Sequence, residues 1–387
     1  MIQVAWIRGK YLNNFEGQNY DFEEGEIEVT GFSSLTPIHI NLPFPVVNLF
    51  SISDFEEFPY VRSIPFFRNA IRFISNRTLG DAQILYRLEE ELSKKQFDIV
   101  HSADPHYYYS FQAARLRRAG KIKKLVITSW ETIAHNNEST YAKAYIKKYV
   151  MQTADRFITY TDRARDTLIS EGVPIGKISR VHLGVQLKRF HHPRHETPHP
   201  HELTILCVSR LVKEKGVIDL YHAFKKLRDT VKDTSLMLRI VGDGPLKRQL
   251  NDLIAIDNLK DIVKLDTRSY KEMFEVYGEG DIFVLPSISS KTWEEQLGMV
   301  IMEAMASGLP VVGSSSGAIP EVIGPAGIVY PEGDRDALYH ALYELVTDDK
   351  LRLELSQKSL ARSAQLFDST KASLEIATIY QELVKSS

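Results

Sequence analysis

Residues 294–310 read EEQLGMVIMEAMASGLP, and this stretch decides how the surrounding chain folds. Strong helix formers fill Met299–Ala306, and Gly298 gives the helix a freely shaped entrance. Gly308 followed by Pro310 is a helix stop signal. A short buried strand that starts with two valines is expected directly afterwards. The stretch therefore predicts a polar loop, a helix and a strand in succession.

Two carboxylates of this stretch, Glu295 and Glu303, are candidates for ligand contacts. If both were on one helix, their eight-residue separation would place them about 12 Å apart along its axis. The two catalytic carboxylates of a glycosidase lie about 5 Å apart in retaining enzymes and less than about 10 Å apart in inverting ones. The pair is therefore unsuited to acid and base work on one bond. It suits two contacts along one long ligand, whose anionic middle would meet the positive helix N-terminus between them.

The order of residues here resembles the signature of the retaining glycosyltransferases of family four. The resemblance is carried by Glu295, Gly298, Glu303 and the run AMASGLPVV over residues 304–312. It implies that Glu303 holds the ribose hydroxyls of a sugar nucleotide. It also implies that Glu295 and the backbone after it meet the donor sugar, which adds as candidates Gln296, Leu297, Gly298 and Met299. The alternative is a surface helix with ordinary acids.

Composition sets limits on the class of protein. A chain of 387 residues has room for two domains, each with its own core. Its formal charge of −2 argues against an extended nucleic-acid surface. Cys207 is the only cysteine, which excludes an intrachain disulfide, and its apolar neighbours indicate a buried thiol. These features fit a cytoplasmic protein.

Neither a signal peptide nor a membrane span is expected. Residues 1–8 read as the start of a strand and are too short for a signal peptide, and no apolar run is long enough to cross a bilayer. A peripheral contact with the inner face of the membrane stays open, because Asp54–Asn76 mixes aromatic residues with arginines. Core packing of one helix with arginines on its wet side explains the same residues and is favoured. The basic run from Arg115 to Lys124 is interpreted as a solvated helix end.

Residues 1–190 read as alternating strands and helices. A polar loop, Gly9–Gly17, follows the first strand, at a place where the family has a glycine-rich turn near the donor phosphates and the acceptor. This chain departs from the family, because the usual paired glycines are missing. Gly17 is kept as a substrate-binding candidate, with an ordinary connecting loop as the alternative.

Two further loops of the first half follow predicted strands, where doubly wound sheets hold ligands. The strand Phe97–His101 resembles a family strand that ends in a histidine, and His106 in the loop beyond it is a candidate. Trp130 stands where many members of the family carry a histidine that touches the donor sugar, so that contact is in doubt. Glu131 beside it is a candidate polar contact or weak base.

The second half begins with an apolar strand, Leu203–Val208, followed by Arg210 and Lys215. The resemblance implies that these two cations clamp the donor's two phosphates. The leaving diphosphate gains negative charge in the transition state, which fixed cations stabilise. Arg210 can bind as a fork and Lys215 as a point charge. A glycine that the family has near Asp266–Arg268 is missing, which leaves the identity of the base open.

These features together predict an α/β protein of the GT-B fold, with two Rossmann-like doubly wound domains that face each other across a cleft. The predicted parts are an acceptor-side domain (1–190), a linker (191–202), a nucleotide-sugar-binding domain (203–367) and a helix that crosses back to the first domain (368–387).

The predicted reaction transfers a hexosyl-type sugar from a nucleotide-diphosphate donor to an acceptor hydroxyl with retention, without a metal or other cofactor. The catalytic candidates are Glu295, Arg210 and Lys215. An acceptor sugar, a lipid-linked glycan and a small metabolite all stay open as acceptors. The alternatives are a sugar-nucleotide epimerase on the same fold and a sugar-nucleotide-binding protein without catalysis.

Overall fold

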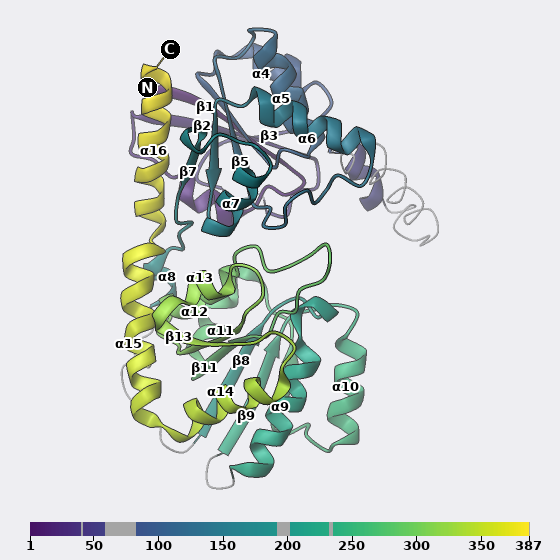
Figure 1. Cartoon of the computed structure of the whole chain (residues 1–387), viewed down its shortest axis with the longest axis vertical. Coiled ribbons are helices and arrows are strands. Elements are labelled where there is room, and N and C mark those ends of the chain that lie inside the picture. The colour runs from purple at the N-terminus through teal and green to yellow at the C-terminus, as the bar shows by residue number, and fades with distance from the viewer. Residues whose placement is uncertain (40–41, 59–82, 192–201, 232–234, 387) are drawn as a thin grey trace. The chain divides into compact units, whose positions relative to one another are not determined.

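The computed structural model describes residues 1–39, 42–58, 83–191, 202–231 and 235–386. The described chain forms two compact units. The first unit is Met1–Leu183 together with Ser369–Ser387, and the second is Gly184–Asp368. Each unit is built on one parallel β-sheet with helices around it (Figure 1). The predicted α/β class with two Rossmann-like domains is confirmed.

The sheet of the first unit has the strand order β3-β2-β1-β4-β5-β6-β7. All its described pairings are parallel. Its strands are β1 (Ile2–Gly9), β2 (Ile27–Ser33), β3 (Val46–Asn48), β4 (Ile99–Ala103), β5 (Lys124–Ser129), β6 (Arg156–Thr159) and β7 (Ile178–Arg180). Its helices are α1 (Asn14–Gly17), α4 (Leu88–Lys94), α5 (Tyr108–Arg118), α6 (Tyr141–Thr153), α7 (Asp162–Ser170) and α16 (Ser369–Lys385). The strand order reverses between β1 and β4, and such a reversal is where this kind of sheet binds ligands.

The sheet of the second unit has the order β10-β9-β8-β11-β12-β13, again with parallel pairings. Its strands are β8 (Glu202–Val208), β9 (Ser235–Val241), β10 (Val263–Asp266), β11 (Ile282–Leu285), β12 (Val311–Ser314) and β13 (Gly327–Tyr330). Its helices are α8 (Leu187–Phe190), α9 (Val217–Thr230), α10 (Lys247–Ile256), α11 (Met273–Gly278), α12 (Met299–Ala306), α13 (Ile319–Ile323), α14 (Arg335–Thr347) and α15 (Asp349–Leu366). Here the order reverses between β8 and β11.

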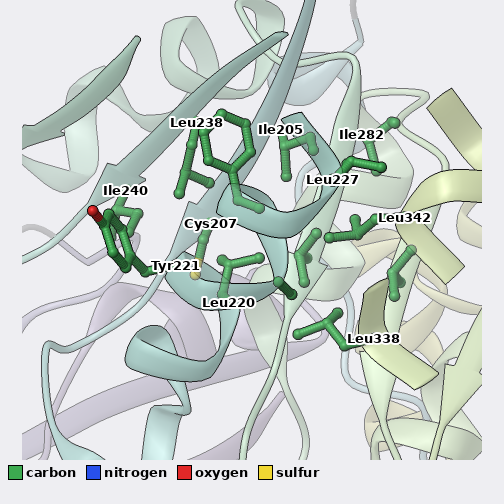
Figure 2. Close-up of a cluster of buried hydrophobic side chains, with 14 of the residues drawn as sticks. Ile205, Cys207, Leu220, Tyr221, Leu227, Leu238, Ile240, Ile282, Leu338 and Leu342 are labelled. Carbon is green, nitrogen blue, oxygen red and sulfur yellow. The ribbon is translucent and has the colours of Figure 1, made fainter. Parts of the chain in front are cut away.

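A core of aliphatic side chains joins this sheet to α9 and α14 (Figure 2). The buried face of α9 includes Leu220, Tyr221 and Leu227, at the spacing that places side chains on one side of a helix. Cys207 of β8 lies in the same core and is fully buried, as its apolar neighbours predicted. Burial raises the pKa of the Cys207 thiol to about 12, so it stays protonated and unreactive near neutral pH.

The last helix, α16, belongs to the first unit, although the helix before it, α15, belongs to the second. The hydroxyl of Ser373 donates to the backbone carbonyls of Asn19 and Asp21, both at 3.0 Å. The hydroxyl of Tyr380 makes a 2.6 Å hydrogen bond with Nδ1 of His101, a fully buried side chain of β4. These polar contacts attach α16 to the first unit, at the segment after α1 and at strand β4.

The unit boundary differs from the predicted domain boundary over residues 184–190. These residues group with the second unit because α8 packs there. The ring of Phe190 lies 5.8 Å from that of Tyr277, and Arg189 donates to the carbonyl of Tyr270 at 2.6 Å. Most of the predicted linker, residues 192–201, lies outside the described residues.

No helix in the described part of the chain is long and apolar enough to cross a membrane. Of the aromatic and basic stretch 54–76, residues 59–76 lie outside the described residues. In the basic run at the end of α5, Arg117 pairs with Asp155 at 2.8 Å and Lys123 pairs with Asp98 at 2.7 Å. Arg118 lies 3.8 Å above the ring of Tyr149. These cations therefore have partners in the protein, which fits the interpretation of this run as a helix end.

Candidate functional site

The loops after β8 and β11 leave the second sheet side by side, because these two strands are neighbours at the reversal of strand order. The loop after β8 carries Arg210 and Lys215, and the loop after β11 carries Glu295. Gly216 has φ +61, and a Cβ there would lie 1.8 Å from the carbonyl oxygen of Pro286. Only glycine lets the first loop approach the backbone of the second so closely.

The two cations of the first loop have different surroundings. Arg210 is exposed, and no side chain of the described residues bonds to its guanidinium. Lys215 is half-buried, its ammonium pairs with the carboxylate of Glu295, and it lies 5.0 Å from the centre of the Trp293 ring. Arg210 is thus available to an anion without breaking a contact. Lys215 would have to divide its positive charge between the incoming anion and the carboxylate of Glu295.

Glu295 is held in the loop before α12, as predicted, and not on the helix itself. The Ser287 hydroxyl donates to its Oε2 at 2.8 Å, and the backbone N–H of Ala318 donates to its carbonyl at 2.8 Å. Gly317, with φ +52, would carry a Cβ only 2.0 Å from that carbonyl oxygen. The loop after β12 therefore packs tightly on Glu295 and fixes its position.

Helix α12 has the predicted bounds, with Gly298 at its N-cap in the left-handed region (φ 75). The neighbouring candidates differ in exposure: Leu297 is buried, Met299 is half-buried and Gln296 is exposed. Glu303 lies within the helix and is only 3 % exposed. Glu303 and Glu295 are therefore on different elements, because the helix begins only after Gly298.

The carboxylate of Glu303 has one occupied oxygen and one open oxygen. The hydroxyl of Tyr277 in α11 donates to Oε2 at 2.6 Å. Oε1 is buried and accepts no hydrogen bond from the described residues. Burial raises the pKa of Glu303 to about 7, although the hydrogen bond from Tyr277 and the charge of Arg189 oppose this rise. A buried acceptor without a donor is costly, so this oxygen is suited to a hydroxyl supplied by a ligand.

The candidates of the first unit lie at the carboxyl edge of its sheet. His106 is buried, and its ring lies 4.2 Å from that of Tyr107. The backbone N–H of Trp130 donates to Oδ1 of Asp104 at 2.7 Å, and the indole ring lies 4.6 Å from that of Tyr160. Asp104 was not among the predicted residues, although its place directly after a buried strand is a signal that could have identified it.

The carboxylate of Glu131 is engaged by hydrogen bonds within its own loop. Oε1 of Glu131 accepts from the backbone N–H groups of Thr132 and Ile133 at 3.1 and 3.0 Å. Its Oε2 accepts from the side-chain amides of Asn136 and Asn137 at 3.0 and 2.7 Å. Four donors thus engage this carboxylate within its own loop, which leaves little capacity for a role as a base.

Gly17 ends the short helix α1, where a plain polar loop was expected. A Cβ there would lie 2.2 Å from Cδ2 of Leu42, so a larger residue at position 17 would displace the end of that leucine side chain. The same segment contains a residue that the sequence did not single out. Glu16 forms a buried two-bond ion pair with Arg8 of β1, at 2.8 and 2.6 Å, and accepts from the Tyr160 hydroxyl at 2.9 Å.

One group of the described residues has the spacing of metal ligands: His135, Glu138 and Glu171 of the first unit. The ammonium of Lys147 lies 2.5 Å from Glu171 and 3.1 Å from Glu138. This buried cation pairs with both carboxylates and occupies the space between them and their neighbours, so the group is better explained as an ion-pair cluster than as a metal centre.

Comparison with known proteins agrees with this arrangement. The family model described as glycosyl transferases group 1 matches residues 189–362, and the model described as Glycosyltransferase Family 4 matches residues 47–189. The putative colanic acid biosynthesis glycosyltransferase WcaL of Salmonella typhimurium is 29% identical over 280 residues, which are 70% of this chain and 68% of that protein. The amylovoran biosynthesis glycosyltransferase AmsK of Erwinia amylovora is 36% identical over 182 residues, 46% of this chain and 44% of that protein.

Solved structures share the fold at low sequence identity. Sucrose-phosphate synthase from Thermosynechococcus elongatus matches with a TM-score of 0.74 and 18% identity over 100% of both chains. HepE from Anabaena, solved in complex with UDP, matches with a TM-score of 0.70 and 15% identity over 99% of this chain and 100% of that one. The two parallel α/β units and these neighbours define the class, a glycosyltransferase fold of the GT-B type. Within that class, the two consecutive family matches show that the chain belongs to the glycosyltransferases of family 4.

Proposed function

We propose that this chain transfers a sugar from a nucleoside-diphosphate donor to an acceptor hydroxyl, with retention of the anomeric configuration. The observation that carries the proposal is the open Oε1 of Glu303. A ribose presents two adjacent hydroxyls, and a carboxylate can accept from both. In this assignment the two oxygens of Glu303 receive the ribose, and the Tyr277 hydroxyl keeps Oε2 in position.

Arg210 and Lys215 would hold the diphosphate of the donor. Arg210 is exposed and has no bonded side chain in the described part of the chain, so it needs to break no contact to bind. The ammonium of Lys215 is already positioned by Glu295 and Trp293. Preorganised cations of this kind stabilise the charge that develops on the leaving group.

The donor sugar would lie between Glu295 and the backbone at the start of α12. In the proposed reaction the bond from the anomeric carbon to the diphosphate oxygen breaks, and the acceptor oxygen attacks from the same face. The acceptor hydroxyl gives its proton to the departing phosphate oxygen. No protein group is needed as a base, because the leaving phosphate takes the proton. Arg210 and Lys215 supply the positive charge that stabilises the leaving diphosphate, so we propose a reaction without a metal or other cofactor.

The acceptor is proposed to be part of a glycan. The names of the relatives WcaL and AmsK refer to the synthesis of polysaccharides, colanic acid and amylovoran. This supports polysaccharide synthesis as the setting. A free sugar, a lipid-linked glycan at the inner face of the membrane and a small metabolite are the acceptors to be distinguished.

Calorimetric titration of the full chain with UDP, GDP and ADP tests the donor site. One nucleotide is expected to bind, and Glu303→Ala is expected to weaken it about 10- to 100-fold, the usual effect of losing hydrogen bonds to a charged group. Asp281→Asn is the matched control, because this buried carboxylate, which accepts from the N–H of Thr204 at 2.8 Å, precedes β11 at the opposite edge of the sheet. Failure of all three nucleotides to bind would overturn the assignment.

A product assay then separates the proposed reaction from its two alternatives. Incubation of the preferred nucleotide sugar with a panel of glycoside acceptors should yield a new glycoside and free nucleoside diphosphate. An epimerised nucleotide sugar without acceptor consumption would instead indicate an epimerase. Nucleotide binding without any product would indicate a binding protein.

A further inference from the structure

The carboxylate of Glu295 belongs to the phosphate-binding part of the proposed site as well as to its sugar-binding part. Its Oε2 pairs with the ammonium of Lys215 and accepts from the hydroxyl of Ser287 at 2.8 Å. Its Oε1 accepts no hydrogen bond from the described residues. A negative charge therefore stands beside one of the two cations that would hold the donor's diphosphate, and one of its oxygens is open to a ligand.

The loops around this ion pair hold both of its partners in place. The centre of the Trp293 ring lies 5.0 Å from the ammonium of Lys215. The backbone N–H of Ile288 donates to the carbonyl of Glu214 at 2.8 Å, which joins the loop after β11 to the loop after β8. Glu295 itself is only 8 % exposed. The ion pair is thus built into the site, unlike a pair of exposed side chains, which contributes little.

Two ligands of the proposed reaction differ in the charge that they bring to this pair. In the sugar nucleotide, the sugar is attached to an oxygen of the terminal phosphate, so that oxygen cannot ionise. In the nucleoside diphosphate that remains after transfer, the same oxygen is free and loses its proton at about pH 6. The product therefore places more negative charge next to Glu295 than the donor does. Like charges at such short range repel, and they do so more strongly where the site is partly shielded from water.

The same carboxylate attracts the intact donor. A sugar hydroxyl is a hydrogen-bond donor, and a bond to the ionised Oε1 of Glu295 is stronger than a bond between neutral groups. The neighbouring cations do not remove this difference, because Arg210 attracts both ligands and Lys215 divides its charge between the phosphate and Glu295. Removal of the Glu295 charge should consequently change the affinities for donor and product in opposite directions.

We propose that Glu295 discriminates between donor and product: it favours the intact sugar nucleotide and disfavours the nucleoside diphosphate left after transfer. The inference rests on the proposed function, since both ligands would occupy the proposed donor site. It gives Glu295 a task beyond contact with the sugar, because the carboxylate lowers the affinity for the product and so favours its release. A residue that only held Lys215 in place would have the opposite effect, since its loss would weaken binding of the product.

Calorimetric titration of the full chain at pH 8, where the terminal phosphate is ionised, tests this discrimination. The probes are UDP with UDP-glucose, GDP with GDP-mannose, and ADP with ADP-glucose, and the pair that binds the wild type is used for the variants. Glu295→Gln keeps the size of the side chain and removes its charge. It is expected to bind the nucleoside diphosphate about fivefold more tightly. It should bind the sugar nucleotide about threefold more weakly, because the sugar hydroxyl loses a charged acceptor.

Further variants separate charge from shape and from general electrostatics. Glu295→Ala also removes the charge and should tighten the nucleoside diphosphate, whereas Glu295→Asp keeps the charge and should not. Glu214→Gln is the matched control, because Glu214 precedes Lys215 in the same turn and its carboxylate forms no ion pair among the described residues. This variant should bind both ligands as the wild type does. The nucleoside monophosphate, which has no terminal phosphate, should bind Glu295→Gln and the wild type equally.

Three results would overturn the inference and leave the donor site intact. They are unchanged or weaker binding of the nucleoside diphosphate in Glu295→Gln and Glu295→Ala, an equal gain of affinity in Glu295→Asp, or an equal gain in Glu214→Gln. The last result would mean that a general effect of charge is sufficient. Failure of every nucleotide to bind the wild type would instead overturn the proposed donor site, and the inference with it.

Discussion

Lowering the pH through 7 should weaken nucleotide binding, because Glu303 must be ionised to accept two ribose hydroxyls. Burial raises its pKa to about 7 in the free protein. If the nucleotide binds only to protein in which Glu303 is ionised, its apparent Kd is proportional to 1 + [H⁺]/Ka, where Ka is the acid dissociation constant of Glu303. Between pH 8 and pH 6 that factor rises about tenfold, or about 1.4 kcal/mol.

The measurement is a calorimetric titration of the preferred nucleoside diphosphate at pH 6, 7 and 8. The phosphates of the nucleotide also titrate near pH 6, so the wild type is compared with Glu303→Gln, in which only that contribution remains. The 2′,3′-dideoxy nucleotide is a second control, because it has no ribose hydroxyls for Glu303 to bind. Equal pH dependence in the wild type and in Glu303→Gln would refute the assignment of Glu303 to the ribose.

Three further predictions concern the same unit. Because the folded-state pKa of Glu303 (about 7) exceeds the usual value of 4.5, the folded protein binds more protons than the unfolded chain between these values, and stability falls as pH rises through them. Glu303→Gln should therefore raise the free energy of unfolding at pH 8, by at most about 3 kcal/mol, in urea titrations, and no gain there would contradict the raised pKa. Arg210→Ala should weaken nucleoside diphosphate binding by about 2 kcal/mol and leave the melting temperature unchanged, and an unaltered Kd would exclude Arg210 from the phosphate site. Gly317→Ala should destabilise the second unit by about 1 to 3 kcal/mol, because its φ is +52 and its Cβ would lie 2.0 Å from the carbonyl oxygen of Glu295. A melting temperature equal to that of the wild type would show that the loop after β12 does not pack on Glu295 as described.

Local signals in the sequence were sufficient for the elements that carry the second unit's site. Helix α12 begins after Gly298 and ends before Gly308, as the helix formers and the stop signal predicted. The placement of Glu295 in the loop ahead of that helix follows from the same residues. Such features depend on the conformational preferences of a few consecutive residues, and those preferences can be read without knowledge of the rest of the chain.

Local signals were less informative in the first unit. Glu131 and Gly17 look like ligand contacts in the sequence, yet the first is engaged by four donors of its own loop and the second packs against Leu42. The sequence did not single out Asp104, which is buried at the sheet edge and accepts from the backbone N–H of Trp130. Hydrogen-bond satisfaction depends on which distant segments approach a side chain, and this cannot be judged from residue type alone.

By itself, then, the sequence determined the α/β class, helix α12 and its flanking loops, and the identity of the carboxylates and cations that stand near them. Only the tertiary structure decided the state of these groups. It brings Tyr277 to one oxygen of Glu303 and leaves the other open, and it pairs Arg8 of β1 with Glu16 in the interior of the first unit. The physical reason is that burial and pairing, which set the pKa and the free hydrogen-bonding capacity of a group, arise from contacts between segments far apart in the chain.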